Sequence, residues 1–66
     1  MKLKLDQKAD ALYLRLDDSK IIESEEVSPG VVLDFNASGV VVGIEMRDLS
    51  QRSPKLDFHG LQVQTV

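Results

Sequence analysis

The sequence has no cysteine and no tryptophan, and its 66 residues include only one tyrosine, one histidine, two phenylalanines and two prolines. Without cysteine, the chain has no disulfide, no thiolate metal ligand and no cysteine nucleophile. A single histidine, His59, cannot build a zinc site by itself, so we predict no metal and no other cofactor. The aromatic fraction of 5% leaves few rings to stack on bases, which argues against nucleic-acid binding.

Charge also argues against nucleic acid, and hydropathy argues against a membrane. The formal net charge is −3 and the sequence pI is about 4.9, so the chain should not be attracted to a phosphate backbone. Lysine alternates with leucine over residues 2–5, unlike the continuous apolar core of a signal peptide. No apolar run reaches the length that spans a bilayer. We therefore expect a soluble cytoplasmic protein that binds no membrane.

The length predicts one small domain over residues 1–66, in which residues 53–66 form a tail of undefined packing. A chain of this size buries only about 60% of its unfolded surface, and disulfides, metals or oligomerisation commonly compensate. Because the first two are not expected, we predict a homo-oligomer, with a dimer favoured. Val32 and Val41 are the candidate contacts.

The clearest structural pattern covers residues 33–46, where two strand-like runs flank the turn cluster Asn36–Gly39. A four-residue loop at this cluster would pair Phe35 with Val40 and would place the large apolar side chains, with Met46, on one face. The full set of predicted pairs is Phe35–Val40, Leu33–Val42 and Val31–Ile44.

The alternative is a three-residue loop, which would pair Phe35 with Val41 and mix Glu45 into the apolar face. A one-residue slip inverts the two faces of a strand, so we predict the four-residue form. Gly43 then marks a bulge or a close approach to the strand. The opposite face of the hairpin would carry Val32, Asp34, Val41, Gly43 and Glu45.

A second hairpin is predicted from alternating leucines in residues 2–6 and 11–16. Pairing Leu5 with Leu12 and Leu3 with Leu14 keeps the leucines on one face and requires a four-residue connection. Asp10, in that connection, tolerates the left-handed backbone region better than most residues.

Residues 21–27 read as an edge strand, because charged side chains on both faces would block further pairing. Ser28-Pro29-Gly30 supplies a type II turn into the next strand. Together these segments predict an all-β fold, an antiparallel meander of about five strands built from two hairpins. Asp48 is expected to cap a short helical turn at 48–52. Alternation over 61–65 predicts a C-terminal strand, with a disordered tail as the alternative.

Few residues suggest chemistry. The acidic edge Glu23, Glu25 and Glu26 raises the question of a cation site, but a solvated edge strand explains it better. Asp34 and Glu45 lie in a partly apolar setting of the kind that raises a carboxyl pKa, but we expect the chain to be too small to form a pocket alone. His59 has no partner at a diagnostic spacing, so a loop or packing role is favoured. We predict no catalytic residue and no metal ligand.

Three blocks of sequence carry a family resemblance: KLDQKADALYLRL (4–16), ESEEVSPGVVLDF (23–35) and GVVVGIEM (39–46). In this order they are similar to the small prokaryotic proteins grouped as domain-of-unknown-function family 2283, over residues 1 to about 52. The resemblance implies the β-meander and carries over no activity or catalytic residue. The association of some members with small toxin-like proteins implies an antitoxin or neutralising role.

Two hypotheses about function result. The first is a protein–protein interaction module, antitoxin-like in its sharpest form, whose acidic 17–26 segment masks a basic protein partner. The alternative is a small-ligand binder or enzyme with a site shared between subunits. The candidate interaction or ligand face consists of Tyr13, Arg15, Val32, Asp34, Val41 and Glu45.

Overall fold

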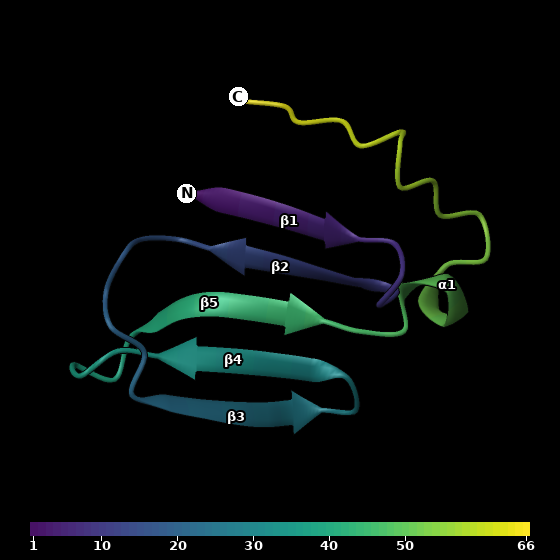
Figure 1. Ribbon diagram of the computed structural model, residues 1–66. Helices are drawn as coiled ribbons and strands as arrows, with labels where there is room; N and C mark the ends of the chain where they lie inside the picture. Colours follow the sequence, from purple (N-terminus) through teal and green to yellow (C-terminus); the bar gives the residue numbers. More distant parts are fainter.

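The computed structural model describes residues 1–66 as one open antiparallel sheet with a short helix (Figure 1). This confirms the predicted all-β class, the five strands and the helical turn. No helix has the length and apolar character that crossing a membrane requires. The elements are β1 (Lys2–Asp6), β2 (Ala11–Arg15), β3 (Glu23–Ser28), β4 (Val31–Phe35), β5 (Val41–Met46) and α1 (Leu49–Arg52).

The order of the strands corrects the predicted meander. Across the sheet the order is β1-β2-β5-β4-β3, so only β3, β4 and β5 follow one another as a meander. After β2 the chain crosses to the far edge, and β2 pairs with β5 instead of β3. β1 and β3 are therefore the two edge strands. The edge position predicted for residues 21–27 from their charges is confirmed for β3.

The first hairpin has the predicted register. Leu3 pairs with Leu14 and Leu5 with Leu12 across a four-residue connection. Asp10 closes this connection with a φ of 54°, which its short polar side chain tolerates. The alternation of leucines was sufficient here because only one register keeps them all on one face.

The loop of the second hairpin corrects the predicted register. Phe35 pairs with Val41, not with Val40. The amide of Asn36 donates to the carbonyl of Val40 at 3.0 Å, so the loop between them has three residues. Val41, predicted on the face opposite Phe35, is instead paired with it.

A β-bulge then restores the apolar pattern along the rest of this hairpin. The register shifts between Asp34 and Phe35, and Leu33 pairs with Ile44 instead of Val42. Val42 is the additional residue on β5, and it is 2% exposed. The bulge accommodates one extra valine and keeps the large apolar side chains in register across the sheet.

The registers give the sheet two chemically different faces, because directly paired residues project to the same side. We call one the leucine face; its rows carry Leu3, Leu5, Leu12, Leu14, Val31, Leu33, Phe35, Ile44 and Met46. We call the other the polar face; it carries Lys2, Lys4, Tyr13, Arg15, Ser24, Glu26, Val32, Asp34, Gly43 and Glu45.

The helix is capped by a residue that the sequence did not indicate. Asp48 precedes α1 in the left-handed conformation, with φ 57°, and its side chain makes no capping hydrogen bond. Instead, the Asp10 carboxylate accepts from the amide of Ser50 at 3.0 Å and from its hydroxyl at 2.7 Å. The Asp10 carbonyl also accepts from the amide of Leu49. The first hairpin turn therefore anchors the helix.

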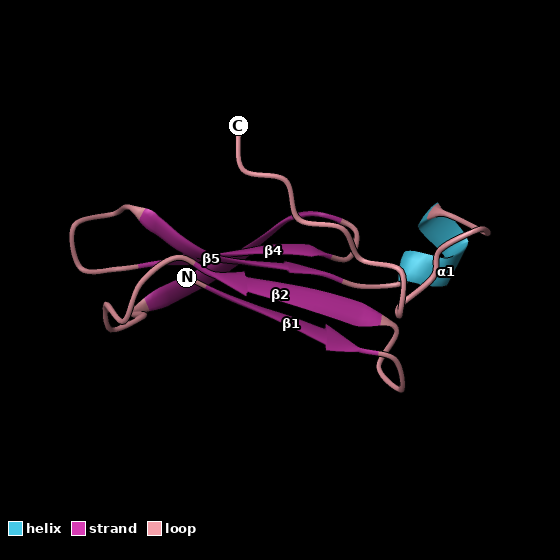
Figure 2. Ribbon diagram, turned by 90° about the horizontal axis from the view of Figure 1, so that it is seen from above, coloured by secondary structure: helices cyan, strands magenta, loops and turns pink.

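The C-terminal segment corrects a further prediction. Residues 61–66 form no strand and are exposed. Figure 2 shows the sheet nearly edge-on, with the C-terminal segment leaving the sheet and no second layer of helices or strands. Phe58 is half-buried, whereas Leu56 is 42% exposed.

The sheet consequently buries very little. The apolar residues that are fully buried are Ala11, Val42 and Leu49. Leu3 and Leu5 of the leucine face remain 39% and 37% exposed, and the inner strands are only half-buried. A single sheet without a second layer cannot remove its apolar face from water.

Candidate functional site

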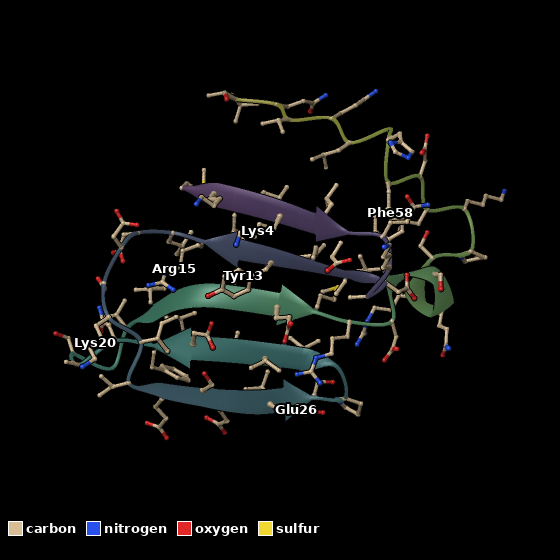
Figure 3. All side chains as sticks on the ribbon, viewed as in Figure 1. Lys4, Tyr13, Arg15, Lys20, Glu26 and Phe58 are labelled. Atoms are coloured by element: carbon tan, nitrogen blue, oxygen red, sulfur yellow. The ribbon has the colours of Figure 1, made fainter.

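A hydrogen-bond network crosses the polar face at the middle of the sheet. The Tyr13 hydroxyl, from β2, donates to Asp34 Oδ2 on β4 at 2.7 Å. From the edge strand β3, the Ser24 hydroxyl donates to Asp34 Oδ1 at 2.6 Å. Figure 3 shows the Tyr13 side chain lying over β5. Both oxygens of the Asp34 carboxylate are thus engaged by hydroxyl groups from different strands.

Gly43 makes this network possible. It lies on β5 directly between Arg15 of β2 and Asp34 of β4. A Cβ atom at this position would lie 2.5 Å from the Tyr13 hydroxyl oxygen and 2.8 Å from Asp34 Oδ2. The close approach predicted for Gly43 is confirmed, and the bulge adjoins it.

The Tyr13 hydroxyl is held in its protonated form. Its hydrogen bond to the Asp34 carboxylate raises the pKa of Tyr13 above 10.0, with desolvation as the second cause. The phenolate would face the carboxylate without a proton between them, so ionisation is disfavoured. Tyr13 therefore acts as a hydrogen-bond donor at neutral pH, not as a base.

Arg15 extends the network to the loop that crosses from β2 to β3. Its Nε donates to the Asp17 carbonyl at 2.7 Å, and Nη2 donates to the Ser19 carbonyl. Nη1 reaches the Tyr13 hydroxyl at 3.5 Å, at the limit of a hydrogen bond. The Asp17 carboxylate accepts the Ser19 amide at 2.8 Å, and hydrogen bonds from Ser19 lower the pKa of Asp17.

An open hollow lies beside these residues and the β1 edge. Its volume is about 430 Å³, within the range of about 300–1,000 Å³ that small-molecule sites occupy. Three basic and two acidic side chains surround it, so its lining is weakly positive overall. Its lining residues are Met1, Lys2, Lys4, Tyr13, Arg15, Asp17 and Asp18.

The candidate face predicted from the sequence is only partly assembled. Tyr13, Arg15 and Asp34 come together as described. Glu45 pairs with Tyr13 in the strand register, but its carboxylate binds Arg47 at 3.2 Å and lines a separate hollow of about 150 Å³. Val32 lies on the same face, opposite Glu45. Val41 belongs to the other side of the sheet.

The acidic edge divides between the two faces. Glu23 and Glu25 pair with Phe35 and Leu33, so they border the leucine face. Glu26 belongs to the polar face and accepts the Gly30 amide at 3.2 Å. No group of three His, Asp or Glu side chains is arranged to hold a metal ion.

Sequence reasoning missed the role of Ser24. Its hydroxyl supplies the second hydrogen bond to the Asp34 carboxylate. Ser24 and Glu26 are two positions apart on β3, so the alternation of side chains along a strand places both on one face. This spacing was the signal in the sequence for the position of Ser24. His59 lies in the exposed C-terminal segment, where its amide donates to Asp57 at 2.9 Å.

Comparison with known proteins gives one family and no individual relative. Residues 2–50 match the model of a family described as "Protein of unknown function (DUF2283)". This confirms the resemblance that the three sequence blocks indicated. No curated protein and no solved structure matches significantly.

Proposed function

The chain belongs to the DUF2283 family, and from its geometry we propose that it is a protein–protein interaction module that binds polypeptide through its leucine face. The observation that carries this proposal is the open apolar side of the sheet. Three apolar residues are fully buried in the whole chain, whereas nine large apolar side chains line the leucine face. Leu3 and Leu5 are exposed and the other seven are only half-buried, and a contiguous apolar surface left open to water marks interaction sites in soluble proteins.

The hydrogen-bond network on the polar face also supports an interaction module. Its network of Tyr13, Asp34 and Ser24 ties β2, β4 and β3 together with side chains alone. Such a network fixes the positions of these strands relative to one another. Neither Tyr13 nor Asp34 is arranged as a nucleophile with a base, so the network is read as structural.

Hydroxyl-radical footprinting tests the proposal. In a lysate that contains the native partner, side chains of the leucine face, such as Leu14 and Ile44, should be protected. Val63 and Val66, which are 80% and 120% exposed, serve as reference positions in the same sample. Leu14 is half-buried in the single chain, so labelling of Leu14 that matches this partial exposure, both in lysate and in the purified protein, would refute the proposal.

The antitoxin-like version is a narrower form of this proposal. It requires a basic polypeptide at the acidic edge, and Glu23, Glu25 and Glu26 supply the charge. All three are exposed, and only Glu26 has a hydrogen-bond partner, the Gly30 amide, so this edge is accessible to a cationic partner. Reversal of all three to lysine should abolish binding of such a partner, and unchanged binding would exclude this version.

A second candidate function is binding of a small ligand in the 430 Å³ hollow. The observation that favours it is that Lys2, Lys4 and Arg15 line this hollow together with Tyr13. Tyr13 is the only tyrosine and the chain has no tryptophan, so intrinsic fluorescence reports on this position alone. Titration with small phosphates and carboxylates should change that fluorescence, and Lys2→Gln/Lys4→Gln should remove the change. A flat titration with all of them would exclude this candidate.

A further inference from the structure

We propose that the leucine face is covered by a second copy of this chain, in a face-to-face dimer whose two-fold axis runs parallel to the strands. The inference rests on the proposed function, since it names the polypeptide that the leucine face binds. Two observations carry it: the excess surface of the single chain and the unequal charge of its two edges.

The surface area of the chain is too large for a self-sufficient monomer. A compact monomer of 7.3 kDa should expose about 4,200 Å². This chain exposes 5230 Å², about 1,000 Å² more than that scaling predicts. Each partner in a stable interface loses about 800 Å². The excess area lies on the uncovered leucine face and on the extended C-terminal segment. A second sheet packed on the leucine face would bury the part of the excess that lies there.

The two edges of the sheet carry opposite charge. β1 presents Lys2 and Lys4 with one acid, Asp6, whereas β3 presents Glu23, Glu25 and Glu26 and no base. Figure 3 shows Lys4 and Glu26 on strands at opposite edges of the sheet. The chain is therefore electrically polar across the sheet, at right angles to its strands.

This polarity selects between the two symmetric ways of stacking the sheet on a copy of itself. An axis perpendicular to the strands, in the plane between the sheets, would place β1 over β1 and β3 over β3, with like charges facing. An axis parallel to the strands places β1 of each copy over β3 of the other. The second arrangement brings opposite charges together twice, because a two-fold interface repeats every contact.

The positions of the glutamates fit this arrangement. Glu23 and Glu25 project from the leucine face, at its rim, and so toward the second sheet. In the single chain Lys2 and Lys4 line the hollow on the polar face. Because β1 is an edge strand, their long side chains can turn around it toward a second sheet. Stacked sheets lie about 10 Å apart, which is about the screening length at 0.1 M salt. The opposed edges are thus close enough to attract.

Edge-to-edge assembly is the competing arrangement. β1 against β1, or β3 against β3, would oppose like charges. β1 against β3 would be attractive, but it leaves the leucine face in water and generates open-ended chains of subunits because the contact is heterologous. It predicts a mass that grows beyond the dimer as concentration rises.

Sedimentation equilibrium on the full chain provides the test. We expect a mass of twice 7.3 kDa that does not increase further with concentration. Glu23→Lys/Glu25→Lys/Glu26→Lys should weaken dimerisation at least about tenfold, since several ion pairs become repulsions. The triple variant changes the formal net charge from −3 to +3, so the magnitude of overall self-repulsion is unchanged.

The decisive variant adds Lys2→Glu and Lys4→Glu to the triple reversal. The exchanged edges should restore dimerisation to within about threefold of the original, which a general loss of folding would not allow. With the axis perpendicular to the strands, neither set of reversals would alter the dimer, and that result would overturn the proposal. Asp18→Lys/Asp57→Lys is the control, because both acids are exposed and lie outside the edge strands.

Footprinting separates failure of this inference from failure of the proposed function. A monomeric chain with Leu14 labelled in purified protein, but protected in lysate, would overturn the dimer and leave the interaction module standing. Labelling in both samples would overturn both. Growth of the mass beyond the dimer with Leu14 labelled would establish edge-to-edge assembly and overturn the stacked dimer.

Discussion

The Tyr13 hydroxyl reaches Asp34 at 2.7 Å by passing over Gly43, and this path is open because Gly43 has no side chain. Each of the three residues belongs to a different strand, β2, β4 and β5. The hydrogen bond therefore links β2 and β4 across β5, where Gly43 contributes only backbone. Its tight fit gives the first prediction.

Gly43→Ala should destabilise the fold. The new Cβ would lie 2.5 Å from the Tyr13 hydroxyl oxygen and 2.8 Å from Asp34 Oδ2, so both groups must shift. Forcing atoms into such a site costs about 1–3 kcal/mol. The free energy of unfolding in urea, at one fixed protein concentration, measures the loss.

Tyr13→Phe supplies the matched background for this measurement, because it removes the oxygen nearest to the new Cβ. The cost of Gly43→Ala should be smaller in that background than in the original chain. Equal costs in both backgrounds would show that the Tyr13 hydroxyl does not define the space above Gly43.

Alkaline pH should weaken the same network. The pKa of Tyr13 is raised above 10.0 in the folded chain, chiefly by its hydrogen bond to Asp34. A raised pKa means that the folded state holds the proton more tightly than the unfolded state. Its contribution to stability is complete below about pH 10 and disappears as pH rises through the folded-state pKa.

The tyrosinate absorbance measures this pKa directly, since the chain has one tyrosine. Asp34→Asn should lower the titration midpoint toward 10.0 by removing the carboxylate charge. Glu45→Gln is the control, because Glu45 pairs with Tyr13 in the register but makes no hydrogen bond with it. A midpoint that does not respond to Asp34→Asn would contradict the assigned cause.

The Asp10 side chain should contribute measurably through α1. Asp10→Ala removes the carboxylate that accepts from the Ser50 amide and hydroxyl, and loss of such a cap costs about 0.5–2 kcal/mol. Alanine also tolerates the φ of 54° poorly. Asp10→Asn keeps an acceptor oxygen and the backbone conformation, so it should lose less.

Asp48→Gly tests whether this effect is specific to Asp10, because glycine removes the carboxylate and tolerates the left-handed conformation, whereas asparagine would cap as well as aspartate. Asp48 occupies the N-cap position, but its side chain makes no capping bond, so the substitution should leave the unfolding midpoint nearly unchanged. A loss at Asp48 equal to that at Asp10 would mean that the helix is capped from its own N-terminus in solution.

The sequence predicted the hairpins where a single pattern dominated. Leucines at every second position of β1 and β2 allow one register, and that register is present. Near Val41 the pattern does not determine the register, because residues 40–42 are all valine and a shift by one residue leaves an apolar side chain on each face. The bulge uses this ambiguity, so neither loop length considered alone gives the observed pairing.

The strand order and the site were predictable to different degrees. An edge position for β3 follows from Glu23, Glu25 and Glu26, but local pattern does not say which edge it occupies. Tyr13, Arg15 and Asp34 were placed on one candidate face from parity and register. The hydrogen bond from Ser24 to Asp34 requires β3 to lie beside β4. The hydrogen bond from Tyr13 to Asp34 requires β2 to lie beside β5. The alternation of side chains along one strand does not reveal which strands are neighbours.

Arg15 should control the order of the crossing loop more than the stability of the sheet. Its guanidinium donates to the carbonyls of Asp17 and Ser19, and these are the bonds that hold the loop to the polar face. Arg15→Gln would leave both carbonyls without that donor. Amide hydrogen exchange in residues 16–22 should accelerate, because protection depends on local opening, whereas amides of β4 and β5 should exchange as before. Arg15→Lys keeps the charge but lacks the planar fork that reaches both carbonyls, so it should restore only part of the protection. Equal acceleration across the whole sheet would show that Arg15 acts on global unfolding instead.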